Sequence, residues 1–166
     1  RLRMELHANS LAEKMSRLGD GTFIPLHAPA RVSSTLVRDE LMKEESVQDA
    51  VKLMNRIDVA LVGIGYPNEH SAIKATGYYK ENEIESLVSR KAAGELCMQF
   101  YDIEGYTEPY ASDNAVIGMD IHRLCKVPCS VGIAGGKEKL SAIQGAINGK
   151  YINVLITDTE CARALL

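Results

Sequence analysis

The stretch VGIAGGKEKLSAIQGAI, residues 131–147, combines residues whose types and order suit the binding of an anion. Apolar residues lead into Gly135 and Gly136, which let the backbone turn sharply and approach a ligand closely. The helix predicted after the turn directs free N–H groups and the positive end of its dipole at whatever occupies the turn. Lys137 or Lys139 could neutralise a negative charge there. The pattern also fits an ordinary strand-to-helix connection without a ligand, and both interpretations stay open.

Two further sets of polar residues are candidates for a binding site. Glu95 follows Gly94 at the start of the apolar segment ELCMQFYD, where a carboxylate needs a partner or a ligand hydroxyl to offset its desolvation. His7 and Asn9 stand two residues apart near the start of the first predicted helix. They point in different directions unless that helix begins near residue 9, so a polar helix face is the alternative interpretation.

The spacing of apolar residues along the chain predicts the helices and strands that position these residues. Helices are predicted over residues 4–18, from a cap at Ser33 or Ser34 to about 43, from a cap at Ser46 to 57, around 84–88, after a cap at Asp120, over 140–147, and after a cap at Thr157 or Asp158. Strands are predicted over residues 22–27, 59–64, 95–102, 128–133 and 151–158.

The three strongest predicted strands alternate with helices, which favours parallel pairing with right-handed crossovers and helices on both faces of the sheet. We therefore predict one α/β domain with a mostly parallel, doubly wound (Rossmann-like) sheet. The segment ELCMQFYD and the turn after it predict a short antiparallel part.

Ligands of such sheets bind outside the carboxyl ends of the strands. Three polar or glycine-rich turns are expected at that edge: GIGYP with Gly63 and Gly65, AGGKEK, and TDTE. The GIG segment lacks the third glycine and the immediate helix of a dinucleotide-binding loop, so no dinucleotide is expected there.

Composition narrows the class of protein. Of the 166 residues, 46% are apolar and 25% are charged, which are ordinary values for one globular domain. The net charge of −3 predicts no basic surface for nucleic acid within this stretch, and no apolar run is long enough to cross a membrane. The four histidines lack metal-ligand spacing, and the four cysteines form no CxxC pair, which indicates a reducing cytoplasm and no metal site.

Seven segments resemble the effector-binding domain of the SorC family of bacterial transcriptional regulators, in order and spacing, from residue 3 to residue 166. They are HANSLAEKM, PLHAPARV, DVALVGIGYP, AAGELCMQFYDIEG, VIGMDIHRL, VGIAGGKEKLSAI and YINVLITDTECARALL. The resemblance implies a fold similar to that of sugar-phosphate isomerases and glucosamine-phosphate deaminases, which agrees with the predicted sheet.

The resemblance also implies which residues face the ligand. His7 and Asn9 would face it, Glu95 would accept sugar hydroxyls, and Lys139 would contact phosphate or a sugar oxygen. Glu95 stands where many relatives have aspartate. With the glycines of the two turns, the predicted effector-binding residues are His7, Asn9, Gly63, Gly65, Glu95, Gly135, Gly136 and Lys139.

The chain opens with Arg1 inside a helical pattern, so we expect it to be part of something longer. The resemblance implies that a helix-turn-helix DNA-binding domain and the first part of the effector domain, with a phosphate-binding loop, lie outside residues 1–166. Without that part, we expect the parallel sheet to expose an edge or a face.

Two functions remain open at this point. The first is an effector-binding domain that senses a sugar or sugar phosphate in the cytoplasm, without catalysis or a cofactor, in a homo-oligomer that contacts operator DNA through the absent domain. The second is a sugar-phosphate isomerase or deaminase, which would need Glu95 or Asp102 as a general base.

Overall fold

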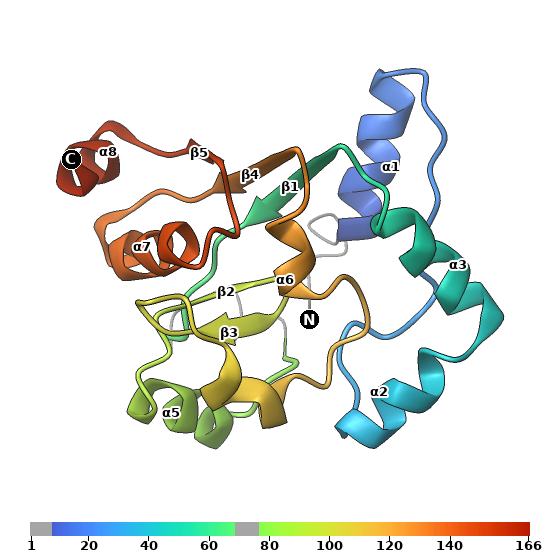
Figure 1. The fold of residues 1–166 in the computed structure, drawn as a ribbon, viewed down its shortest axis with the longest axis horizontal. Helices are drawn as coiled ribbons and strands as arrows, with labels where there is room; N and C mark the ends of the chain where they lie inside the picture. The colour runs from blue at the N-terminus through green and yellow to red at the C-terminus, as the bar shows by residue number, and fades with distance from the viewer. Residues whose placement is uncertain (1–7, 69–76) are drawn as a thin grey trace.

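The structure, a computed structural model, describes residues 8–68 and 77–166 (Figure 1). Its α-helices are α1 (Ala8–Leu18), α2 (Thr35–Leu41), α3 (Glu45–Met54), α5 (Glu81–Ser89), α6 (Ile121–Leu124), α7 (Leu140–Asn148) and α8 (Thr159–Leu165). Its strands are β1 (Val59–Gly63), β2 (Gly94–Leu96), β3 (Gln99–Tyr101), β4 (Cys129–Ile133) and β5 (Val154–Ile156). Two 3-10 helices, η2 (Glu108–Asp113) and η3 (Lys137–Lys139), complete the described elements.

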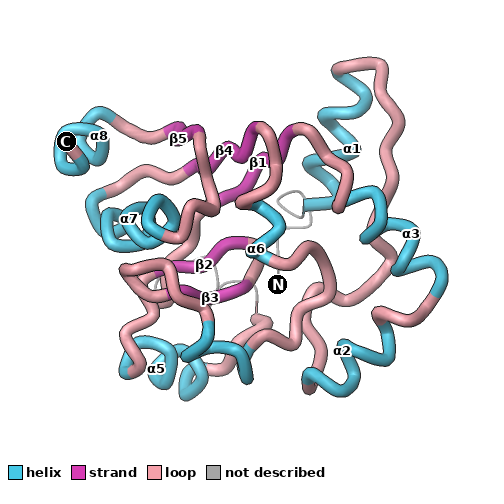
Figure 2. Tube along the Cα trace, in the orientation of Figure 1, coloured by secondary structure: helices cyan, strands magenta, loops and turns pink. Residues whose placement is uncertain are grey.

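The strands form two separate sheets, which Figure 2 shows in magenta. One is a parallel sheet in the order β1-β4-β5, with β4 at its centre, and the other is the antiparallel hairpin β2–β3. All three parallel strands point the same way, so their carboxyl ends meet at one edge of the sheet. The predicted mixed α/β fold, with a parallel sheet and a short antiparallel part, is confirmed.

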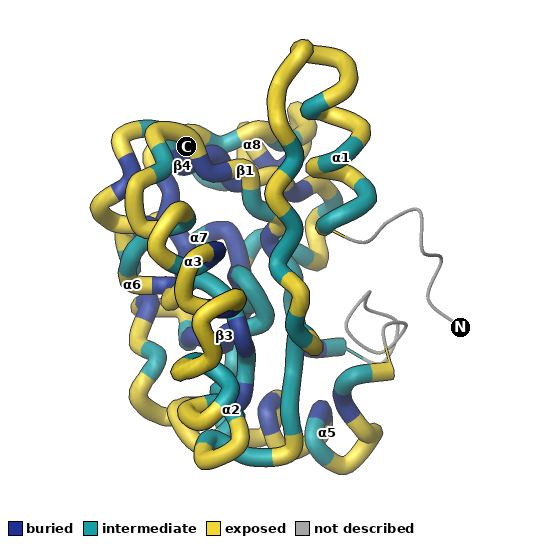
Figure 3. Tube along the Cα trace, turned by 90° about the vertical axis from the view of Figure 1, so that its right-hand side faces the viewer, coloured by how far each residue is buried: buried dark blue, intermediate teal, exposed yellow. Residues whose placement is uncertain are grey.

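The main core lies between the parallel sheet, the hairpin and α7. Ile143 and Ala142 of α7 are fully buried in it, together with Leu96 and Tyr101 of the hairpin. The Tyr101 hydroxyl donates a hydrogen bond of 2.9 Å to the Ala142 carbonyl, which satisfies the only polar atom of that buried side chain. Figure 3 shows that α1, α2 and α3 lie mostly at the exposed surface, so the core depends on the chain from β1 onward.

One face of the parallel sheet is largely bare. Five apolar side chains on this face keep between 42% and 54% of their surface exposed: Val59, Leu61, Ile133, Val154 and Ile156. They share one face because of the strand register, which pairs Leu61 with Val131, Val131 with Val154, and Ile133 with Ile156. In Figure 1, α7 and the hairpin lie on the other side of the sheet. An exposed sheet surface was expected, but the predicted helices on both faces of the sheet are not found on this side within the described residues.

Several predicted boundaries change in the structure. Residues 22–27 form no strand, because Pro25 removes a backbone donor from the middle of the segment. Helix α3 begins at Glu45 with Glu44 as its N-cap, so the predicted cap at Ser46 is wrong. The cap of α2 is Ser34, whose hydroxyl accepts a hydrogen bond from the Val37 N–H.

The segment ELCMQFYD does not form one strand. It folds back on itself between β2 and β3, where Cys97 and Met98 both take positive φ angles, of 53° and 61°. Two consecutive left-handed residues are the geometry of a tight hairpin turn, which usually recruits Asn or Gly. The residues here gave no such signal, so the prediction missed the turn.

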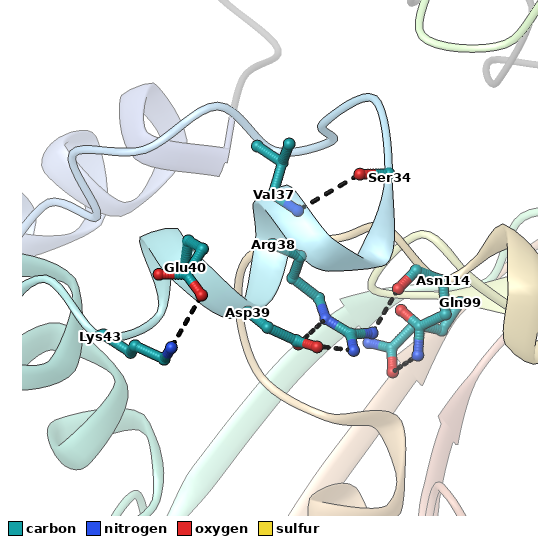
Figure 4. A network of polar contacts seen from close by, with 8 residues as sticks. All are labelled: Ser34, Val37, Arg38, Asp39, Glu40, Lys43, Gln99 and Asn114. Carbon is teal, nitrogen blue, oxygen red and sulfur yellow. Dashed lines mark hydrogen bonds and ion pairs between the residues drawn. The ribbon is translucent and has the colours of Figure 1, made fainter.

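A polar network fastens α2 to the segment that precedes α6 (Figure 4). Arg38 donates to the Asn114 carbonyl at 2.5 Å and also to the Asp39 carboxylate. The buried Gln99 side chain accepts hydrogen bonds from the Asn114 side chain at 3.3 Å and the Ile121 N–H at 3.0 Å. Because these groups satisfy one another, the network holds α2 against the hairpin and the segment before α6.

The two isoleucines of α7 test the assignment of the core. Ile143 is fully buried, whereas 41% of Ile147 is exposed. We expect Ile143→Ala to lower the free energy of unfolding by roughly 2–5 kcal/mol because it leaves a cavity. Ile147→Ala should cost less than about 1 kcal/mol. Urea unfolding of both variants measures the difference, and equal losses would contradict this placement of α7.

Candidate functional site

A pair of backbone hydrogen bonds joins the end of the parallel sheet to the hairpin. The Gly65 N–H donates to the Glu95 carbonyl at 3.0 Å, and the Glu95 N–H donates to the Gly65 carbonyl at 2.9 Å. This isolated antiparallel bridge places Glu95 beside the carboxyl end of β1, although 29 residues separate the two in the sequence. The structure therefore brings together two predicted site residues from different parts of the chain.

The Glu95 side chain lies against Gly65. A Cβ atom at Gly65 would overlap Oε1 of Glu95 and come within 2.9 Å of its Cδ, so any larger residue here would force the carboxylate to move. The Met98 N–H donates to Oε2 of Glu95 at 2.8 Å, which ties the hairpin turn to the same group. Gly65 and Met98 thus fix the position of this carboxylate.

Burial raises the pKa of Glu95 to about 7, against the opposing effects of the Met98 N–H and the positive charge of Lys139. Near neutral pH, Glu95 therefore exists in both protonation states. It can accept hydrogen bonds when ionised, and it can also donate one when protonated.

The side chain of Lys139, at the end of η3, also contacts the end of β1 beside Glu95. Its Nζ donates a hydrogen bond of 2.7 Å to the Ile64 carbonyl, next to the Gly65–Glu95 bridge. The ammonium group keeps further N–H donors for another partner, since a lysine has three. Lys139 thus points from the end of η3 toward the end of β1. Its side chain makes a specific contact there and does not simply extend into solvent.

Tyr66 is a neighbour of this cluster that the sequence reasoning did not select. It follows Gly65 directly, and its ring centre lies 5.9 Å from Nζ of Lys139. The ring is partly buried against the main core. Tyr66 belongs to the motif GIGYP, which was predicted to lie at the ligand-binding edge of the sheet. Its place in that motif could have identified it as a candidate site residue. We call Gly65, Tyr66, Glu95 and Lys139 the Glu95–Lys139 cluster.

The Gly-Gly turn after β4 holds an anion that belongs to the chain itself. The Gly136 N–H donates to Oδ2 of Asp158 at 2.6 Å, while Oδ1 accepts from the Cys161 N–H and caps α8. These backbone N–H groups lower the pKa of the Asp158 carboxyl. Gly136 has a φ of +100°, and a Cβ at Gly135 would come within 2.9 Å of Asp158. Both glycines therefore have a structural role in the strand-to-helix connection, and their contact with Asp158 is the part that the sequence did not predict.

The remaining predicted site residues are less closely connected. Gly63 ends β1, and nothing lies within 4 Å of a Cβ atom built there. Asn9 lies near the start of α1 and donates to the Leu26 carbonyl at 3.4 Å. His7 lies outside the described residues.

Two other surface features do not resemble a ligand site as closely. Hollows of about 290 and 260 Å³ share Gln99, Asn114 and Asp120, and neither is lined by a member of the Glu95–Lys139 cluster. Arg38, which lines the larger hollow, is already neutralised by Asp39. Gln99 and Asn114, which line both hollows, belong to the network of Figure 4.

The described part of the chain shows neither a cluster of metal-binding side chains nor a membrane-spanning helix. Across residues 8–68 and 77–166, no three histidine, cysteine or acidic side chains gather closely enough to hold a metal ion. None of the helices described there is long and apolar enough to cross a bilayer.

A parallel α/β sheet with a carboxylate and an ammonium group at the carboxyl end of its strands defines a ligand-binding domain of the α/β class. The family described as "Putative sugar-binding domain" (Sugar-bind) matches residues 1–166. The Sorbitol operon regulator of Klebsiella pneumoniae is 35% identical over 138 residues, which are 83% of this chain and 44% of that protein.

Two solved structures extend the comparison to the fold. Full-length SorC from Klebsiella pneumoniae aligns with a TM-score of 0.88 at 31% identity, over 99% of this chain and 53% of that one. A chain described as the "putative sugar-binding domain of transcriptional repressor" from Vibrio fischeri aligns with a TM-score of 0.83 at 25% identity, over 96% of this chain and 64% of that one. The protein belongs to the family of SorC-type sugar-binding domains, and it spans less than half the length of the curated relative.

Substitution of Gly65 tests the packing of the cluster. We expect Gly65→Ala to lower the free energy of unfolding by roughly 1–3 kcal/mol, because the added methyl group must displace the Glu95 carboxylate. The matched control is Gly63→Ala, for which the structure leaves open space, and its effect should stay within about 1 kcal/mol. Chemical denaturation measures both, and a neutral Gly65→Ala would show that Glu95 does not lie where the structure places it.

The raised pKa of Glu95 predicts a pH dependence of stability. A carboxyl whose pKa is higher in the folded state favours folding most at low pH, and this contribution is lost as pH rises from about 4.5 through about 7. We expect the wild type to lose up to about 3 kcal/mol of unfolding free energy relative to Glu95→Gln across this window. Urea unfolding at pH 5, 6, 7 and 8 measures this difference, and parallel curves for the two proteins would refute the assignment.

Proposed function

We propose that residues 1–166 are the effector-binding part of a SorC-type transcriptional regulator, and that the Glu95–Lys139 cluster binds a sugar or sugar phosphate. The observation that carries this proposal is the meeting of a partly buried carboxylate and an ammonium group at the end of β1. A carboxylate accepts hydrogen bonds from sugar hydroxyls, and an ammonium group neutralises a phosphate or donates to a sugar oxygen.

Each predicted site residue has a role in this proposal. Glu95 accepts hydroxyl hydrogen bonds, Lys139 contacts an anionic or hydroxyl oxygen, and Gly65 keeps space for Glu95. Because the Asp158 carboxylate already occupies the Gly136 N–H, an effector phosphate at that turn would share or replace this contact. The remaining proposed contacts, carried by the family resemblance, are His7, Asn9, Gly63 and Gly135.

The whole protein is proposed to contain more than this stretch. Its helix-turn-helix domain would bind operator DNA in the cytoplasm, and the first part of the effector domain would also lie outside residues 1–166. The chain would act as a homo-oligomer in which the effector favours one arrangement of subunits. Only a difference in effector affinity between two arrangements can change the affinity for DNA, and a tenfold change requires about 1.4 kcal/mol.

The alternative function is a sugar-phosphate isomerase or deaminase. One feature favours it, since a carboxyl with a pKa of about 7 is suited to general acid–base catalysis. The other candidate base, Asp102, accepts hydrogen bonds from the Glu104 and Tyr106 N–H groups and thereby shapes its own loop. The relatives reported above are transcriptional regulators, which supports sensing without catalysis.

Substitution of Lys139 tests effector binding in the full-length protein. We expect Lys139→Met to weaken binding of a sugar phosphate roughly ten- to hundredfold, because a hydrogen bond from a charged group contributes about 1.5–3 kcal/mol. Lys137→Met is the matched control, since Lys137 is exposed and pairs with Glu160 at the surface. Thermal-shift titration with a panel of pentose and hexose phosphates, alongside the free sugars, gives the affinities.

Two outcomes would contradict the proposal. Equal ligand-induced stabilisation in the wild type and Lys139→Met would remove Lys139 from the site. Conversion of a panel sugar phosphate by the wild-type protein, followed by NMR, with loss of turnover in Glu95→Gln, would establish the enzyme instead.

A further inference from the structure

The hairpin turn beside Glu95 is held through the main chain of Met98. Cys97 and Met98 take φ angles of 53° and 61°, which residues with a side chain rarely adopt, so the turn needs contacts that hold it in place. The Met98 N–H donates to Oε2 of Glu95 at 2.8 Å, and the Met98 carbonyl accepts a hydrogen bond of 3.3 Å from the Tyr79 hydroxyl. Met98 therefore links Glu95 to Tyr79.

Tyr79 lies in a second core, separate from the one around α7. This second core consists of Tyr79, Ile84, Leu87, Phe100 and Tyr110, and Met98 packs against it. The ring of Tyr79 meets that of Phe100 edge-on, with the ring centres 5.3 Å apart. Burial raises the pKa of Tyr79 well above its usual range, so its hydroxyl remains a hydrogen-bond donor at neutral pH.

Arg31 holds the ring of Tyr79 in place. The guanidinium carbon lies 4.1 Å from the centre of the ring, which is within the range of a cation–π contact. The guanidinium also donates to the Glu83 carboxylate at 2.7 Å and to the Tyr78 carbonyl at 2.6 Å. Because these contacts fix the guanidinium, the Tyr79 ring has little freedom to move away from Met98.

We propose that Tyr79 is a positioning residue for effector binding: its hydroxyl holds the Met98 turn, and the turn fixes the Glu95 carboxylate within the Glu95–Lys139 cluster. The proposal rests on the proposed function in taking Glu95 as a contact of the effector. Tyr79 acts through the main chain of Met98 and does not itself touch the effector. Its hydroxyl carries this role, whereas its ring serves the packing of the second core.

The protonation of Glu95 reports its position. Loss of the Tyr79 hydroxyl releases the Met98 carbonyl and weakens the Met98 N–H bond to Glu95, which opposes the effect of burial, so the pKa of Glu95 should rise further. Two neighbours do not obscure this change, because burial raises the pKa of Cys97 to about 12 and raises that of Tyr101 as well. The Lys139 ammonium, which also opposes the rise, is present in every variant.

Tyr79→Phe in the full-length protein tests the proposal, since it keeps the ring and removes the hydroxyl. Urea unfolding between pH 5 and pH 9 gives the contribution of Glu95 as the difference between a protein and its Glu95→Gln version. We expect Tyr79→Phe to move the pH midpoint of this difference upward by at least about half a pH unit. Tyr110→Phe is the matched control and should leave the midpoint unchanged. Tyr110 lies in the same second core, and its hydroxyl donates at 2.9 Å to the Arg90 carbonyl, outside the Met98 turn.

Binding of the pentose and hexose phosphate panel gives a second readout. Tyr79→Phe should weaken binding roughly three- to tenfold, Tyr110→Phe should not, and Tyr79→Phe should add nothing in the Glu95→Gln background. If no panel member binds the wild type, the proposed function fails, whereas a midpoint that still moves in Tyr79→Phe supports the control of Glu95 by Tyr79. An unchanged midpoint in Tyr79→Phe, an equal change in Tyr110→Phe, or a further loss of binding in the double variant would overturn the proposal.

Discussion

The backbone bridge between Gly65 and Glu95 is the contact on which the arrangement of the site depends. Within residues 8–68 and 77–166 it is the one residue pairing between the two sheets, and it places a carboxylate where a parallel strand ends. The absence of a side chain at Gly65 is part of the same contact, because the carboxylate occupies the space that a Cβ would take. Lys139 completes the arrangement by binding the carbonyl of the preceding residue, Ile64. The polar groups of the cluster are therefore held by main-chain atoms.

The two glycine-containing turns at the sheet edge make room for different carboxylates. At Gly65, the missing side chain admits a carboxylate from the hairpin. At Gly135 and Gly136, it admits the carboxylate of Asp158 and allows a left-handed backbone. One acid thus lies near the ammonium group of Lys139, whereas the other connects β4 to the start of α8. Similar glycine patterns in a sequence can accordingly make room for a carboxylate from a hairpin in one turn and for a helix-capping carboxylate in the next.

The sequence predicted the features that depend on local residues. Continuous apolar runs correctly predicted β1 and β4, and the helical spacing of apolar residues after Gly136 predicted α7. Asp120 was correctly expected to cap α6. Prediction failed where distant groups decide the outcome. No local pattern shows that Asp158 reaches Gly136, or that Glu95 lies against Gly65. The left-handed turn at Cys97–Met98 lacks the usual glycine or asparagine, and it is maintained by the pairing of the strands on either side.

The strand order of the parallel sheet has a consequence for how the chain folds. β1 ends at Gly63, and the strand that pairs with it begins only at Cys129, after the hairpin, η2 and α6 have been synthesised. Closing so long a loop carries an entropic cost before any strand pairing can offset it, which slows folding. By contrast, β4, α7, β5 and α8 follow one another within the last forty or so residues, so their contacts can form early. Within the described residues, β1 therefore gains its pairing partner only once β4 has been made, and until then its apolar side chains need other contacts to protect them from aggregation.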